Sequence, residues 1–146
     1  MKRLGLLLAL LAVGPVAARA DTTRLNHAQS LYLMRCGGCH GIEGVSVPEV
    51  PTLRDRAGMF LCSEPGREYM VRLPNVALSL IRDDQDLADV MNFVAFKLGG
   101  ASAPKGARPY TADEVRKLRA SPLDGATLAR MRQGLMQQYS KGCGGS

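Results

Sequence analysis

The sequence predicts an all-α protein. Apolar residues recur at helical spacing along much of the 146-residue chain, which shows little of the alternating pattern that is typical of β-strands. The clearest helical pattern covers residues 83–98, where the apolar positions are Leu87, Val90, Met91, Val94 and Leu98. A Cys-x-x-Cys-His pentapeptide at residues 36–40, next to a second helical pattern, is the strongest chemical signal in the chain.

The first 20 residues have the pattern of a secretory signal peptide. Two basic residues follow Met1, an apolar run spans residues 4–18, and Ala18-Arg19-Ala20 matches an Ala-x-Ala cleavage site. The apolar run is shorter than the roughly 20 residues that span a bilayer, and no later segment is apolar enough to do so. We therefore expect no stable membrane anchor and a mature, exported protein that begins at Asp21.

A first helix is expected over residues 25–36, and it leads directly into the pentapeptide Cys36-Gly37-Gly38-Cys39-His40. This spacing is the attachment pattern of a c-type haem. Each thiol can add to one vinyl group of the porphyrin, while the side chain of the next residue ligates the iron. Cys36 and Cys39 are therefore the candidate attachment residues, His40 is the candidate proximal iron ligand, and the expected cofactor is one covalently bound haem c.

Two other kinds of site use a Cys-x-x-Cys pair. A closed zinc site needs four ligands, and the isolated Cys62 and Cys143 do not supply a second closely spaced pair. A thioredoxin-like redox pair follows a strand in a βαβ pattern, whereas this pair follows a helical segment. Both alternatives are weaker than haem attachment.

The next elements follow from proline and glycine positions. Residues 41–58 are expected to form a loop, because Pro48 and Pro51 do not suit a helix interior. A short helix fits residues 66–73, between two prolines. The helix over residues 83–98 can be capped by Asp83 or Asp84 at its start, and two glycines follow its end.

Two further helices are expected in residues 101–146. Thr111 and Glu114 form a capping-box pattern at the start of a helix that ends near Ala120. A last helix runs from about Asp124 to Tyr139 and carries four apolar residues on one face: Leu128, Met131, Leu135 and Tyr139. These amphipathic faces favour packing of the extension on its own domain over contact with a partner. Residues 141–146 read as a flexible tail.

Two cysteines lie outside the pentapeptide. In an oxidising compartment leftover thiols are commonly paired, so one arrangement is a Cys62–Cys143 disulfide that ties the tail to the domain. Pairing of Cys143 with a second chain is the alternative.

The charge of the mature chain argues against a nucleic-acid partner. Removal of Lys2, Arg3 and Arg19 with the signal peptide lowers the formal net charge from +6 to +3. The remaining Lys and Arg residues are scattered among Asp and Glu, and they form no basic stripe among aromatic residues.

Residues 25–98 resemble a monohaem cytochrome c domain of the general class I type. The resemblance is carried by the order of elements: a helix before Cys-x-x-Cys-His, a loop with Pro51-Thr52-Leu53, a short middle helix, and a last helix that crosses the first. It covers about half of the chain. It implies a cytochrome c-like helical domain over residues 21–100 around one covalent haem, followed by a two-helix extension and tail over residues 101–146. It also implies haem attachment in the periplasm.

The resemblance implies a hydrogen bond behind the proximal histidine. In the family, the carbonyl of a proline in a Pro-x-Leu segment accepts the Nδ1 proton of that histidine. Pro51 is the candidate here and Pro48 the alternative. Such a bond fixes the tautomer of a metal-ligating histidine and raises its basicity.

One departure from the family concerns the second axial ligand of the iron. In the family, a methionine before the last domain helix binds the iron opposite the histidine, which here corresponds to residues 73–82, and that window contains no methionine. Met70, just upstream, is the candidate distal ligand, with Met59 and Met91 as alternatives. Each of the three also suits an apolar gap-filling role. His27 precedes the motif and is expected to have a surface or core role.

The resemblance implies a periplasmic carrier of single electrons rather than an enzyme. The expected partners are a periplasmic dehydrogenase as donor and a terminal oxidase or another cytochrome as acceptor. The expected walls of the haem site are apolar, which raises the reduction potential, and include Leu31, Leu53, Leu73, Val90 and Val94. If the sixth iron position is open, the alternative is a haem subunit of a periplasmic oxidoreductase or a haem protein that binds small ligands.

Overall fold

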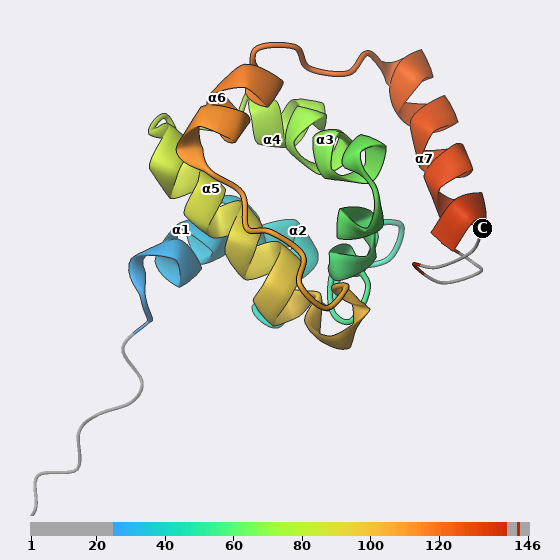
Figure 1. Ribbon diagram of the computed structural model, residues 1–146. Helices are drawn as coiled ribbons and strands as arrows, with labels where there is room; N and C mark the ends of the chain where they lie inside the picture. The colour runs from blue at the N-terminus through green and yellow to red at the C-terminus, as the bar shows by residue number, and fades with distance from the viewer. Residues whose placement is uncertain (1–24, 140–142, 144–146) are drawn as a thin grey trace, which may run out of the picture.

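The computed structural model describes residues 25–139 and 143, and every regular element in these residues is helical (Figure 1). The expected all-α class is confirmed. The elements are α1 (His27–Arg35), α2 (Gly37–His40), η1 (Ala57–Cys62), α3 (Glu64–Arg72), α4 (Pro74–Ala77), α5 (Asp84–Asn92), η2 (Phe93–Leu98), η3 (Gly100–Ser102), α6 (Ala112–Arg119) and α7 (Gly125–Tyr139). The expected signal peptide and most of the expected tail lie outside the described residues.

Helix α1 lies across α5 and its continuation η2 (Figure 1). The side chain of Asn26 caps α1 in a reciprocal capping box with Gln29. Asp83, rather than Asp84, caps α5 by accepting a hydrogen bond from a backbone N–H in the first turn. At the crossing, the fully buried ring of Tyr32 packs against Phe93, with 5.3 Å between ring centroids. This contact places the end of α1 against the core.

The pentapeptide is helical, which the sequence analysis did not anticipate. We expected one helix over residues 25–36 and a glycine-rich exit, but α1 ends at Arg35 and residues 37–40 form the separate helix α2. The two helices are divided at Cys36, whose φ of −124° lies outside the helical range. The chain therefore changes direction at the first thiol.

Two short helices and one change of helix type were also not anticipated. The loop predicted over residues 41–58 ends earlier, because η1 begins at Ala57. Pro74, which was expected only to end the preceding helix, also begins α4. Proline is well suited to the first turn, because its fixed φ is helical and its missing N–H has no partner there. The predicted helix over residues 83–98 is α-helical to Asn92 and then widens to a π-helix over η2.

The extension is joined to the haem-motif half of the chain by a buried arginine. Arg67 on α3 is 2% exposed and donates to both carboxylate oxygens of Glu114 on α6, each at 2.9 Å. It also donates to the carbonyl oxygens of Arg108 and Pro109, at 2.6 and 3.1 Å. Its guanidinium stacks over the ring of Tyr110 at 4.2 Å. These partners compensate the buried charge and hold residues 108–114 against α3.

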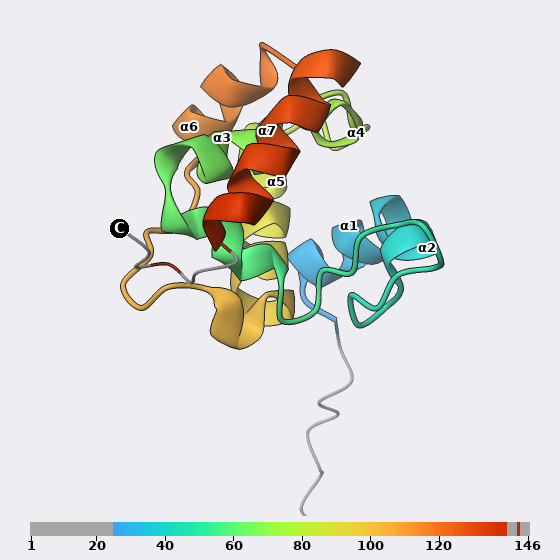
Figure 2. The same cartoon turned by 90° about the vertical axis from the view of Figure 1, so that its right-hand side faces the viewer.

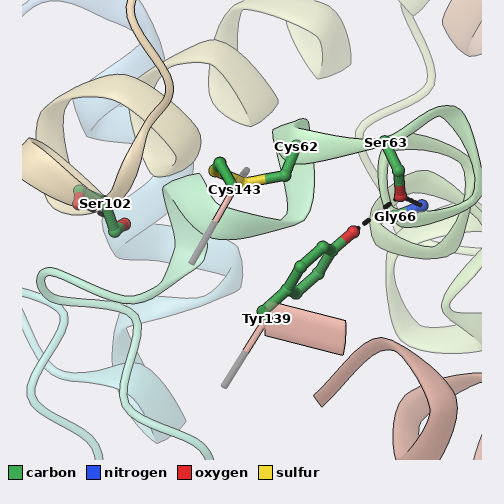
Figure 3. The surroundings of a disulfide bond; sticks show 7 residues. Cys62, Ser63, Gly66, Ser102, Tyr139 and Cys143 are labelled. Atoms are coloured by element: carbon green, nitrogen blue, oxygen red, sulfur yellow. Dashed lines mark hydrogen bonds between the residues drawn. A yellow bond between two sulfur atoms is a disulfide. The ribbon is translucent and has the colours of Figure 1, made fainter. Parts of the chain in front are cut away.

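Helix α7 packs on α3 and η1 and is fastened near its end (Figure 2). The hydroxyl groups of Tyr139 and Ser63 are hydrogen-bonded at 2.8 Å. Of the two arrangements that the sequence left open, the structure has the disulfide within the chain: Cys62 and Cys143 are bonded, with 5.1 Å between their Cα atoms (Figure 3). A Cβ on Gly66 would collide with the Tyr139 hydroxyl, so this close approach requires glycine. The extension therefore packs on its own domain.

Within residues 25–139 and 143, no helix is both long enough and apolar enough to cross a bilayer.

Removal of the buried cation should destabilise the protein strongly. We expect Arg67→Ala to lower the free energy of unfolding by about 3–5 kcal/mol, because it leaves the carboxylate of Glu114 without its main partner. Guanidinium denaturation measures this change. The matched control is Arg116→Ala, which breaks only the exposed pair with Asp113 and should cost less than about 1 kcal/mol. Equal losses in the two variants would contradict the role assigned to Arg67.

The same ion pair should make stability depend on acid. Burial alone would raise the pKa of Glu114, but hydrogen bonds and the charges of Arg67 and Arg108 hold this pKa below its ordinary value of 4.5. Between the folded and the unfolded pKa of Glu114, the unfolded chain therefore binds more protons than the folded chain. The stabilisation that Glu114 contributes is complete above pH 4.5 and is lost as the pH falls through the folded pKa. Melting temperatures between pH 3 and 6 should fall less steeply in Glu114→Gln than in wild type. Parallel curves would argue against this assignment.

Candidate functional site

The helices enclose a cavity of about 840 Å³, which is the size of a pocket for a large organic ligand. Cys36, Cys39 and His40 all line it, so the structure brings the three candidate residues to one site. Four of the five expected apolar wall residues line it as well: Leu53, Leu73, Val90 and Val94. Leu31 does not line the cavity and packs against the neighbouring hydrophobic core instead.

The turn after α1 positions the two thiols and the histidine. The backbone N–H of Cys36 still donates to the carbonyl of Tyr32 at 2.7 Å, and the N–H of His40 donates to the carbonyl of Cys36 at 3.0 Å. The chain then leaves α2 through Gly41, whose φ of +69° is strained for other residues. The Tyr32 hydroxyl donates to the Gly41 carbonyl at 2.7 Å. The buried tyrosine thus holds both ends of the motif.

Contacts behind the imidazole set its orientation and tautomer. Nδ1 of His40 lies 3.1 Å from the Pro51 carbonyl oxygen, so the structure selects Pro51 over Pro48 as the partner. A carbonyl oxygen only accepts, so the neutral ring carries its proton on Nδ1 and leaves Nε2 with a free lone pair. Ser46 Oγ lies 3.1 Å from Nδ1 and donates to the same carbonyl at 2.8 Å.

Burial lowers the pKa of His40, although the hydrogen bond to Pro51 raises it in part. The ring is therefore neutral at pH 7, which is the form that binds a metal. Sequence reasoning did not find Ser46, because a serine in a loop carries no signal until the fold brings it to the ring.

The thiols do not resemble a redox pair. Cys36 and Cys39 are not bonded to one another. Burial, followed by the neighbouring charge of Cys39, raises the pKa of the Cys36 thiol, whereas redox-active pairs have a lowered thiol pKa. Within the described residues, no group of three or more His, Cys, Asp or Glu side chains is arranged to hold a metal ion. The raised thiol pKa of Cys36 thus differs from that of a redox-active pair.

Methionines line the cavity, but none comes from the expected window. Met70 on α3 and Met91 on α5 are buried, Met59 on η1 is partly buried, and all three line the cavity. Met136 on α7 lines it too. Sequence reasoning missed Met136 because the predicted apolar face of that helix did not include it. His27 lies at the surface, where its Nε2 is 3.0 Å from the Asp86 carboxylate.

The polar lining of the cavity fits a flat apolar ligand that carries carboxylates. Its charged residues are Arg35, Arg56 and Arg132, and the lining includes no Asp or Glu. The hydroxyl of Ser79 also lines the cavity, is buried, and has no hydrogen-bond partner in the described residues. A haem combines an apolar ring with two carboxylates, so the size, apolar walls and cationic groups of the site suit it.

The comparisons agree with this chemistry. No family model matches the chain. Two proteins of Thermus thermophilus, each named cytochrome c-552, are similar to it. One is 34% identical over 136 residues, covering 80% of this chain and 87% of the relative. The other is 33% identical over 107 residues, covering 61% of this chain and 82% of the relative. The chain therefore belongs to the c-type cytochromes of the cytochrome c-552 kind, and its cofactor is one covalently bound haem c.

Proposed function

We propose that this c-type cytochrome, an electron carrier, works in the periplasm and carries single electrons between a dehydrogenase and an oxidase or another cytochrome. In this proposal residues 1–20 are removed as a signal peptide, residues 21–100 form the haem domain, and residues 101–146 form an extension with its tail. Cys36 and Cys39 bind the haem through thioethers, and His40 is the proximal ligand. When bound, the haem supplies reversible one-electron exchange at its iron.

One observation carries the proposal: both thiols and the histidine line a single apolar cavity. His40 needs no rearrangement to serve as a ligand, because the Pro51 carbonyl already orients the ring. The apolar walls exclude water and lower the local dielectric, which disfavours the more highly charged ferric state. The chain thus favours a raised reduction potential.

A partner can reach the attachment edge of the cavity. Cys39 is exposed, and exposed apolar side chains follow it in the loop after α2, at Ile42, Val45 and Val47. Exposed apolar groups beside an electron-transfer edge allow brief docking of a redox protein.

A second candidate function is supported by the missing methionine in residues 73–82. If no other side chain binds the distal face of the iron, small ligands can reach it, as in a haem subunit of an oxidoreductase or a ligand-binding haem protein. The carrier is favoured over an enzyme because no second histidine lines the cavity. Met70 stays the candidate distal ligand, since it is buried in the wall.

The first experiment tests covalent attachment. After export and maturation in a competent bacterium, the intact protein should begin at Asp21 and have the mass of the chain plus one haem. Cys36→Ser/Cys39→Ser should show the bare mass, and His40→Ala should keep the haem mass but lose the low-spin spectrum. The matched control is Cys62→Ser/Cys143→Ser, which should retain the haem. Wild-type protein with the bare mass would refute the proposed site.

The second experiment tests the distal position. For a carrier with Met70 as ligand, the oxidised protein should show the weak red-edge band of methionine ligation, and the reduced form should not respond to carbon monoxide. Met70→Ala should lose the band and bind carbon monoxide, whereas Met59→Ala and Met91→Ala should behave as wild type. A wild-type protein that is high-spin and binds carbon monoxide would favour the open-site function.

A further inference from the structure

The last helix supplies part of the cavity wall. Leu128, Arg132 and Met136 follow one another at intervals of four residues, so they lie on one face of α7, and all three line the cavity. The neighbouring Leu135 and Tyr139 are buried in the hydrophobic core. The extension therefore contributes directly to the cavity proposed to hold the haem.

Arg132 is charged, whereas Leu128 and Met136 on the same face of α7 are apolar. It is partly buried, whereas the other two arginines of the lining, Arg35 and Arg56, are exposed and screened by water. No ion pair or hydrogen bond joins Arg132 to another side chain in residues 25–139 and 143, and the lining holds no carboxylate. A partly buried cation without a counter-ion makes this side of the cavity electrostatically complementary to an anion.

The position of Arg132 is held from the end of its helix. The Tyr139 hydroxyl is hydrogen-bonded to the Ser63 hydroxyl, and the Cys62–Cys143 disulfide lies beside this hydrogen bond (Figure 3). At the other end, the Asp124 carboxylate accepts a hydrogen bond from the Thr127 backbone N–H at 2.9 Å. The cap at the start of α7 and the hydrogen bond and disulfide near its end hold this helix in place, and they keep Arg132 beside the cavity.

We infer that Arg132 binds a carboxylate of the haem c and thereby makes the C-terminal extension part of the cofactor site. The inference rests on the proposed attachment of the haem at Cys36 and Cys39. A guanidinium matches a carboxylate with two parallel hydrogen bonds and remains charged at any physiological pH. Arg132 then neutralises a negative charge close to the iron, which makes the ferric state less favourable.

The test measures the midpoint potential of the intact holoprotein. Arg132→Gln leaves the haem carboxylate uncompensated, so the midpoint potential should fall, and the ratio of ferric to ferrous protein at the wild-type midpoint should rise about tenfold. Arg132→Lys, which keeps the charge, should recover most of the difference. The matched control is Arg130→Gln on the exposed face of α7, where Arg130 donates a hydrogen bond to Thr127 and does not line the cavity, so this change should not alter the potential.

Two results would overturn the inference. One is a midpoint potential in Arg132→Gln equal to that of wild type. The other is equal shifts in Arg132→Gln and Arg132→Lys, which would assign the effect to packing rather than charge. Circular dichroism and haem mass establish that each variant is folded and loaded. A wild-type protein without covalent haem would instead refute the proposed function, so the two failures are distinguishable.

Discussion

The buried guanidinium of Arg67 holds the C-terminal extension, residues 101–146, against the preceding half of the chain. Arg67 lies in the protein interior with Glu114 and two backbone carbonyls as partners, and a charge at that depth is tolerated only while those partners stay in place. The segment that leads into α6 is therefore held on α3. Because α7 follows α6 after a short connection, the same interaction sets where α7 begins, and α7 forms one wall of the cavity.

The haem motif depends on a second set of restraints that are close in sequence. Tyr32 binds the backbone beyond the motif, and the Pro51 carbonyl and Ser46 hydroxyl hold the imidazole of His40. The attachment face is thus arranged by residues 32–51, whereas the opposite wall comes from α3, α5 and α7. Contacts between residues close in sequence orient the imidazole of His40, whereas packing between distant segments forms the rest of the cavity wall.

The distal wall is where this chain differs from the family pattern. Residues 73–82, which connect α3 to α5 through α4, contain no methionine, yet four methionines from outside this segment line the cavity. Methionine is flexible and polarizable, so the same side chains suit both a packed wall and an axial ligand. The choice between them decides whether the iron is closed, as in a carrier, or open to small ligands.

The sequence by itself determined the helical class, the haem motif and the cap at Thr111, because each depends on a few neighbouring residues. It left Asp84 as an alternative cap to Asp83 and Pro48 as an alternative partner to Pro51, and the structure decided both. It did not reveal η1, α4, the π-helical turn, Ser46, or the inward positions of Arg132 and Met136. Those features depend on packing between segments that are distant in the chain. Periodicity shows that a helix has an apolar face, but only the tertiary structure decides which side chains beside that face meet a cavity.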